Sequence, residues 1–272
     1  MFMFRRMLFS CLVMILLFAA APIHFADAST IEFTDSVNAQ FKATAERAPG
    51  TIGSRLIKQY DDFKSERKQA MDWDDRISAL RYANEARTSE TRKQINDIDK
   101  DHIHKLEEQL QAAKTKYQPL FNGYTALNKQ ITAARKLKDK SLSKLLQSQA
   151  DGMKILVGLG RQDIRNKQAA LTAAKKERTS KAAKIRSILS EMDPYKSKIK
   201  GDKSAISTPN KLMETEWKNF KAAVKAKESA RTSDTLSRLL TLSGQILTKK
   251  KSIYQYEQKI ETIITRANAQ LK

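Results

Sequence analysis

Apolar side chains recur at steps of three and four residues over long stretches of this chain, and this spacing constrains the fold more than any other feature. One apolar stripe on each stretch predicts long helices that each bury one face against neighbouring helices. Only five prolines and eight glycines occur in 272 residues, so such helices have few places to end. The series are Leu56, Tyr60, Phe63, Ala70, Trp73, Ile77 and Leu80; Ile95, Ile98, His102, Leu106, Leu110, Ala113 and Tyr117; and Leu236, Leu239, Ser243, Ile246, Ile253, Ile260, Ile264, Ala267 and Leu271.

A few short segments carry the residues that usually end helices. The Ala-Pro-Gly run at 48–50 predicts a break between a short first helix and the next one. Pro119 and Gly123 predict an interruption of the chain between them. Residues 193–209, which begin with Asp-Pro and end with proline, form the best candidate for a linker.

An internal repeat relates two stretches that lie 144 residues apart. Trp73 and Trp217 occupy matching positions, and the segments 86–91 and 230–235 both read Ala-Arg-Thr-Ser-acidic-Thr. Threonine and serine hydroxyls cap free backbone N–H groups at a helix start, so we predict that both segments are turns of helical hairpins. The alternative is that each helix runs straight through its segment.

The repeat and the stripes together predict the fold class. We expect an all-α fold, an elongated array of helical hairpins or three-helix bundles joined by long helices. The expected hairpins cover 54–118, 124–192 and 209–271.

The N-terminus has the pattern of a secretory signal peptide. Two arginines at 5–6 precede an apolar run at 7–18, and Ala-Asp-Ala at 26–28 provides a small-x-small cleavage site. Extended to Ala21, the apolar run is about 15 residues, shorter than the roughly 20 that span a bilayer, so an uncleaved membrane anchor is the weaker interpretation. We predict a cleaved signal peptide at 1–28 and a secreted protein. Cleavage would remove Cys11, the only cysteine, and with it any disulfide or thiolate site.

The positive charge is concentrated in the second half of the chain. Residues 29–130 hold 17 basic and 16 acidic residues, whereas residues 131–272 hold 32 basic and 13 acidic ones. We therefore expect a near-neutral helical hairpin region at 29–130, a basic helical region at 131–208 and a C-terminal basic hairpin at 209–272. Such an excess costs self-repulsion unless an anion relieves it.

The lysine-rich clusters of the second half are the candidate contacts for a polyanion. Lysine acts toward phosphate as a point charge, which favours loose polymer binding over the reading of a sequence. We predict a non-enzymatic cell-envelope protein that binds an anionic cell-wall polymer, with an anionic membrane surface as a second partner class and no sequence-specific nucleic acid. The candidate residues are Lys136, Lys138, Lys140, Lys144, Lys175, Lys176, Arg178, Lys181, Lys184, Arg186, Lys196, Lys198 and Lys200.

Catalytic and metal-binding patterns are absent from the sequence. His102 and His104 lie two residues apart and would point in different directions on a helix, and His102 falls on the apolar stripe, where we expect it to be packed. No nucleophile with an adjacent base and no phosphate loop is visible. We therefore expect no catalytic residue, no metal ligand and no cofactor.

Two other functions remain open at this point. Residues 153–160 form the only concentrated apolar patch after the predicted signal peptide, and helical pore-forming proteins hide a longer apolar segment between long helices. A membrane-active helical protein is therefore one alternative. The other is a purely structural coiled-coil interaction protein, whose charge only keeps it in solution.

Two short motifs prompt a comparison with a known class of protein. The segment 133–139 reads Ala-Ala-Arg-Lys-Leu-Lys-Asp, and 222–228 echoes it as Ala-Ala-Val-Lys-Ala-Lys-Glu. With the export signal and the surplus charge, residues 31–272 resemble the helical N-terminal region of some bacterial S-layer proteins. The resemblance implies consecutive three-helix bundles that share long helices, and basic residues that bind secondary cell-wall polymer. The chain differs from that class because no assembly domain follows the helical region.

Overall fold

The computed structural model describes residues 31–271, which form six helices and no strand within that range. The all-α prediction is therefore confirmed for this part of the chain. The predicted signal peptide at 1–28 and Cys11 lie outside the described residues. The helices are α1 (Asp35–Glu46), α2 (Ile52–Asp97), α3 (Lys100–Lys136), α4 (Lys140–Ser190), α5 (Asp193–Ala226) and α6 (Ser229–Asn268).

The two echoed motifs form the two helix–helix turns that end α3 and α5. In the first, the amide of Asp139 donates to the carbonyl of Ala134 at 3.1 Å; in the second, the amide of Glu228 donates to the carbonyl of Ala223 at 3.0 Å. Lys138 and Lys227 occupy the same place in these turns, with φ of 57° and 60°. This left-handed residue after the last helical turn closes a helix end by bonding its free carbonyls.

The described chain falls into two compact units, and α2, α5 and α6 contribute residues to both. Unit 1 comprises residues 31–65 and 207–244. Its core is a cluster of aromatic rings in which Trp217 packs on Phe220 at 4.9 Å and on Phe33 at 5.3 Å between centroids. Tyr60 stacks on Phe220 at 5.5 Å. Burial of aromatic area of this kind dominates the stability of a small core.

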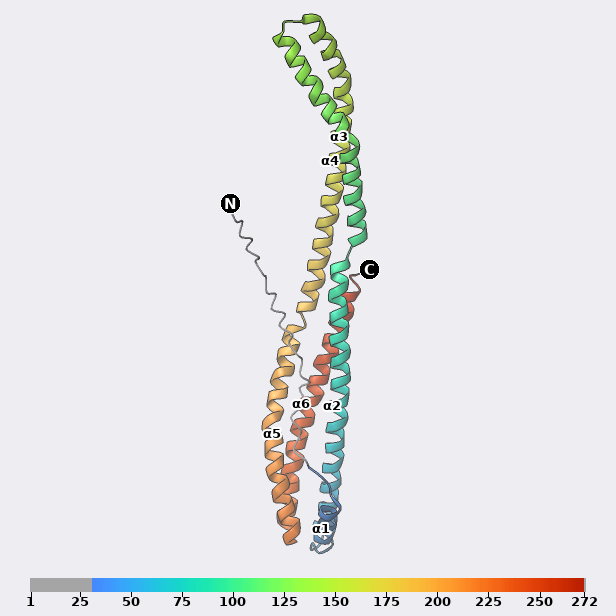
Figure 1. Cartoon of the computed structure of the whole chain (residues 1–272). Helices are drawn as coiled ribbons and strands as arrows, with labels where there is room; N and C mark the ends of the chain where they lie inside the picture. The colour runs from blue at the N-terminus through green and yellow to red at the C-terminus, as the bar shows by residue number, and fades with distance from the viewer. Residues whose placement is uncertain (1–30, 272) are drawn as a thin grey trace, which may run out of the picture. The chain divides into compact units, whose positions relative to one another are not determined.

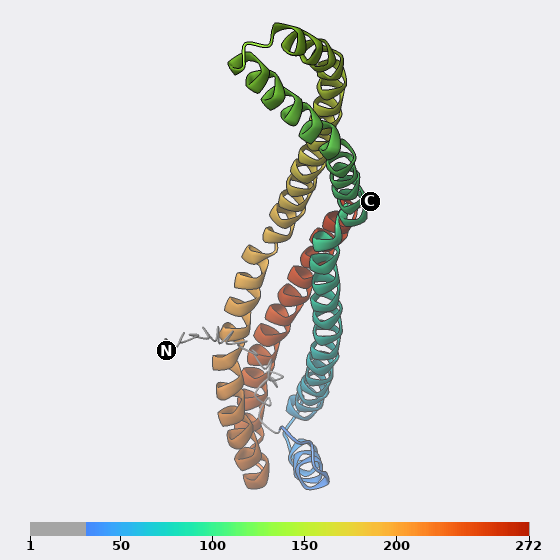
Figure 2. The ribbon, with the colours of Figure 1, turned by 45° about the horizontal axis from the view of Figure 1, so that its top comes forward.

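Unit 2 comprises residues 66–206 and 245–271, and its parts of α2 and α6 lie side by side (Figures 1 and 2). Lys250 contacts Ala70, and Thr91 contacts Asn268 further along both helices. Residue numbers therefore rise together along the contact, which means that the two helices run parallel. A parallel pair needs a long connection, which α3, α4 and α5 provide.

Helices α3 and α4 form an antiparallel hairpin that extends past the end of α6 in unit 2 (Figure 1). Small apolar clusters hold the hairpin together, one of them built from Leu127, Ile131 and Ala150. At Gly160 the two helices approach closely, because a Cβ atom there would lie 2.8 Å from the Tyr117 ring. The concentrated apolar patch after the predicted signal peptide, 153–160, therefore lies within α4 and contacts α3 at Gly160. Its large side chains Ile155, Leu156 and Leu159 are exposed.

The predicted turn at 86–91 is wrong, because this segment lies inside α2. The threonine hydroxyls do not cap a helix start there; those of Thr88 and Thr91 donate to carbonyls four residues earlier, both at 2.7 Å. The matching segment 230–235 lies in the first turns of α6, directly after the turn at Lys227. Threonine can satisfy its hydroxyl in either place, so the repeated motif does not by itself decide between them.

The predicted linker at 193–209 and the predicted interruption at Pro119 are also wrong. Residues 193–209 are the first half of α5, and Pro119 lies within the continuous α3. Asp193 and Pro194 stand at the start of α5, where an acidic residue suits the helix terminus and proline lacks only an N–H that would have no partner. The chain instead breaks at the two residues before Asp193.

One position of the expected apolar stripe on α3 is wrong, whereas Leu110 and Ala113 are buried as expected. His102 is exposed and the neighbouring Ile103 is buried. The chain breaks between α2 and α3, where Asp99 adopts a left-handed φ of 52°, so the spacing from Ile95 does not continue to residue 102. The predicted packed position for His102 is therefore wrong.

Candidate functional site

Several of the predicted polyanion contacts are already paired within the protein. Lys175 contacts Glu107 of α3 at 2.6 Å, and Lys181 contacts Glu177 at 3.3 Å and Asp99 at 3.6 Å. These partners stabilise the charged forms: the hydrogen bond from Lys175 lowers the pKa of Glu107, and the bond to Glu177 raises the pKa of Lys181. Arg178 donates to the backbone carbonyl of Asn96 at 2.7 Å, and Lys196 contacts Asp193 at 3.2 Å.

The other predicted contacts have no carboxylate partner. Lys198 lies over the rings of Tyr195 and Tyr256, with its Nζ 5.7 and 5.6 Å from their centroids. Within residues 31–271, the predicted cations that form no ion pair are Lys136, Lys138, Lys140, Lys144, Lys176, Arg178, Lys184, Arg186, Lys198 and Lys200. No paired carboxylate offsets the charge of these cations toward an external anion.

One of these cations, Arg186, lines a hollow of about 420 Å³ between α2, α4 and α5. We call it the basic groove. It lies in unit 2, where α4 ends and α5 begins. Its lining residues are Arg92, Ile95, Asn96, Arg186, Leu189, Ser190, Asp193 and Lys196.

The electrostatics of the basic groove favour an anion. Lys196 and Asp193 neutralise each other, which leaves the guanidinium groups of Arg92 and Arg186. Within the described chain neither arginine has a hydrogen-bond or ion-pair partner. The Ser190 hydroxyl already donates to the Ser187 carbonyl at 2.6 Å, and Ile95 and Leu189 add buried apolar surface. A guanidinium group binds phosphate or carboxylate through two parallel hydrogen bonds, so both arginines offer the chemistry that recognises such a group.

A second set of cations surrounds the turn between α3 and α4. We call Arg135, Lys136, Lys138, Lys140 and Lys144 the tip cluster. Arg135 donates to the neutral side chain of Gln147 at 3.0 Å, and across residues 31–271 no carboxylate pairs with any member of the cluster. All five side chains are exposed.

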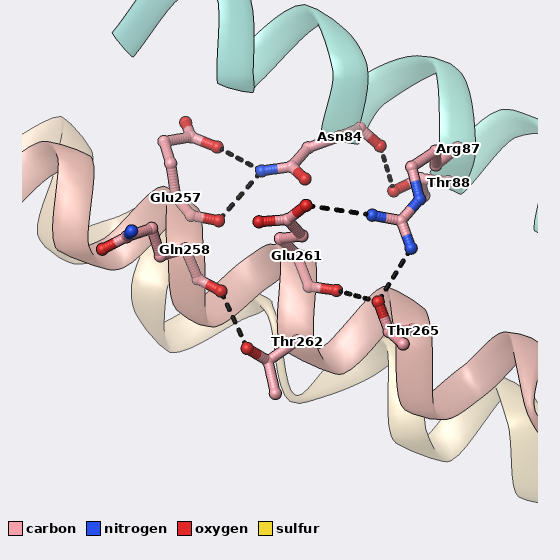
Figure 3. A network of polar contacts seen from close by, with 8 residues as sticks. All are labelled: Asn84, Arg87, Thr88, Glu257, Gln258, Glu261, Thr262 and Thr265. Atoms are coloured by element: carbon pink, nitrogen blue, oxygen red, sulfur yellow. Dashed lines mark hydrogen bonds and ion pairs between the residues drawn. The ribbon is translucent and has the colours of Figure 1, made fainter. Parts of the chain in front are cut away.

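A third polar region, which the sequence analysis missed, is buried between α2 and α6. Figure 3 shows Asn84 of α2 pointing at Glu257 of α6, with Nδ2 2.9 Å from both the backbone carbonyl and Oε2 of Glu257. Beyond it, Arg87 reaches Glu261 at 3.4 Å and Thr265 at 2.8 Å (Figure 3). We call this region the polar seam.

The polar seam also includes Lys250, which precedes Glu257 on α6. Its Nζ donates to the Ala70 carbonyl at 2.9 Å and contacts Asp74, and the residue is only 7% exposed. Burial lowers the pKa of Lys250 and raises the pKa of Glu257, because each charged form loses water. Buried polar contacts between helices fix which residues face each other, so the seam sets the register of α2 on α6.

Among residues 31–271, no group of three or more histidines, cysteines, aspartates or glutamates is placed to hold a metal ion. The helices of the same range contain no stretch that is long and apolar enough to cross a membrane. The polar seam faces the helix interface rather than a cavity, which makes its role structural.

Arg92 is the member of the basic groove that the sequence analysis missed. It belongs to the near-neutral first half, where the balance of charges hides it. No pattern along the chain places it beside Arg186, because the two residues meet only when α2 and α4 pack together. Comparisons with family models, with curated proteins and with solved structures find no match for this chain.

Proposed function

We propose that this chain is a secreted, non-enzymatic cell-envelope protein that binds an anionic cell-wall polymer, and that the basic groove holds one anionic group of the polymer. The observation that carries the proposal is the pair of unpaired guanidinium groups of Arg92 and Arg186 on one hollow. The predicted signal peptide supports the compartment, and the excess charge of residues 131–272 supports the sign of the ligand.

The groove gives the proposal a chemical form. Two arginines on separate helices fit a phosphate or carboxylate from two sides, while the exposed lysines of α4 and α5 attract the rest of the polymer without fixed geometry. Binding of this kind weakens as the salt concentration rises, because the attraction between exposed charges is screened.

A pull-down with purified cell walls over a sodium chloride series tests the groove. The double variant Arg92→Gln/Arg186→Gln removes two unpaired cations, and we expect at least about tenfold weaker binding from the lost charge-assisted hydrogen bonds. The matched control is Lys175→Gln/Lys181→Gln, which removes the same formal charge from residues that are paired internally. We expect the control to bind within about threefold of the original chain, because distant charge is largely screened.

The results separate three interpretations. Equal losses in both variants would mean that only net charge matters, and the groove would not be the contact. Binding that ignores salt would contradict a polyanion ligand altogether. A loss confined to the arginine variant, with unchanged helical content by circular dichroism, is the result that the proposal requires.

A further inference from the structure

The turn between α3 and α4 exposes several large apolar side chains. Leu137 is 78% exposed, Leu145 59% and Leu142 43%, and the three lie within nine residues of the chain. Single exposed leucines are ordinary on protein surfaces, but several on one turn form a patch that usually contacts a partner. No packing within unit 2 requires this patch, because the hairpin core is built from other residues such as Ile131 and Ala150.

The turn holds this patch in a fixed conformation. The amide of Leu137 donates to the carbonyl of Ala133, and the amide of Asp139 donates to that of Ala134, both at 3.1 Å. The carboxylate of Asp139 accepts from the amide of Leu142 at 2.9 Å and caps the start of α4. The leucines therefore stand on a closed helical turn rather than on a loose loop.

The tip cluster surrounds these leucines with positive charge. Residues 135–145 contain five cations and a single carboxylate, that of Asp139, which is engaged as the cap of α4. Within the described chain none of the five cations has a carboxylate partner. Apolar side chains among unpaired lysines are the combination that binds the interface of an anionic bilayer, where the apolar groups enter and the cations contact lipid phosphates.

We propose that the tip of the α3–α4 hairpin, formed by Leu137, Leu142, Leu145 and the tip cluster, docks onto an anionic lipid bilayer. The charge argues for this partner over a second copy of the chain, because two tips would bring ten cations together. The leucines argue for a bilayer over a soluble polyanion, which would leave them in water. The proposal goes beyond polymer binding in the basic groove and uses different residues.

Cosedimentation with lipid vesicles tests the docking. The protein prepared for this test begins at Ser29, so that the apolar run of the predicted signal peptide does not itself bind lipid. Vesicles of phosphatidylglycerol and phosphatidylcholine are compared with vesicles of phosphatidylcholine alone. We expect binding only to the anionic vesicles.

Two tip variants separate the contribution of charge from that of the leucines. Lys136→Gln/Lys138→Gln/Lys140→Gln should lower the partition coefficient at least tenfold, since each lysine near an anionic surface contributes about fivefold. Leu137→Ser/Leu142→Ser/Leu145→Ser should also lower it at least about tenfold. Matched controls elsewhere are Lys68→Gln/Lys93→Gln/Lys114→Gln and Met71→Ser/Leu212→Ser, all at exposed positions, and both should bind within about twofold of the original chain.

Any other outcome would contradict the proposed docking of the tip on an anionic bilayer. Absence of binding, equal binding to neutral vesicles, or tip variants that bind like their controls would each contradict it. Loss in the lysine variant alone would identify a polyanion contact that inserts nothing into a bilayer. The Arg92→Gln/Arg186→Gln variant should bind vesicles normally, so failure of the groove and failure of the tip give different results.

Discussion

The side-chain amide of Asn84 donates to two oxygens of Glu257, the backbone carbonyl and Oε2, each at 2.9 Å. Both residues are buried, at 3% and 4% exposure. Burial raises the pKa of Glu257, while the hydrogen bond from Asn84 opposes that rise by favouring the ionised carboxylate. A carboxyl group whose folded pKa lies above its ordinary value stabilises the fold at low pH, and this contribution is lost as the pH rises toward the folded pKa.

Replacing Asn84 by alanine should therefore destabilise unit 2 in a pH-dependent way. The variant loses the donor that favours the carboxylate, so the pKa of Glu257 rises further and the cost grows with pH above about 4.5. We expect a loss of about 2 kcal/mol at about pH 8 and a smaller loss at about pH 5, measured by denaturant unfolding. Asn128→Ala, at an exposed position of α3, should change stability by less than about 0.5 kcal/mol at both values. A pH-independent loss would contradict this account of Glu257.

The buried pair of Lys250 and Asp74 should behave as a unit. Asp74→Asn leaves the ammonium group of Lys250 buried without its carboxylate, and we expect a loss of about 2–3 kcal/mol. Adding Lys250→Met removes the unpaired charge, so the double variant should recover most of that loss. The exposed pair of Lys58 and Asp62 provides the control, because Asp62→Asn should cost less than about 0.5 kcal/mol. Additive losses in the double variant would show that the pair is not coupled.

Replacing each of two glycines of α4 by alanine should change the stability in opposite directions. Nothing lies within 4 Å of a Cβ atom at Gly158, so Gly158→Ala should stabilise the helix by about 0.5–1 kcal/mol. At Gly160 the added methyl group would lie 2.8 Å from the Tyr117 ring, so Gly160→Ala should destabilise the hairpin by about 1–2 kcal/mol. Thermal unfolding of the two variants measures the difference, and stabilisation by both would mean that α3 and α4 are further apart at this point.

Lysine should stabilise the fold less than glycine would at the left-handed positions of the two turns. Lys138 and Lys227 have positive φ, which costs a residue with a Cβ atom about 1 kcal/mol and costs glycine almost nothing. Lys138→Gly and Lys227→Gly should each raise the free energy of unfolding by about 1 kcal/mol. Lys129→Gly, inside α3, should lower it by a similar amount, and a loss of stability at the turns would place the left-handed residue elsewhere.

The features that depend on short stretches of sequence were predictable. Apolar spacing predicts the helices, the Ala-Pro-Gly run at 48–50 predicts the break after α1, and Gly50 indeed has a φ of 57°. The polar seam could also have been found. Lys250 and Glu257 occupy the heptad row of Ser243 and Ile264 on α6, where the apolar phase calls for buried residues.

The features that depend on contacts between distant helices were not predictable. Asp99 separates α2 from α3 by a conformation that the residue type only permits, and the threonines of α2 bond within their helix where capping was expected. The candidate site shows the same limit. Lys175 looks like Lys176 and Lys184 in the sequence, and only the packing of α4 on α3 places it beside Glu107.

The parallel pairing of α2 with α6 also sets an order of events during synthesis. The polar contacts between the two helices join residues 173 to 180 positions apart, so at typical translation rates α2 leaves the ribosome on the order of 10–35 s before its partners exist. The α3–α4 hairpin has no such delay, because residues close in the sequence contact each other at its turn. Arg135 and Gln147, for example, are separated by 12 positions. Contacts this local form early, so the nascent chain completes its hairpin first and keeps Asn84 and Asp74 hydrated until α6 emerges.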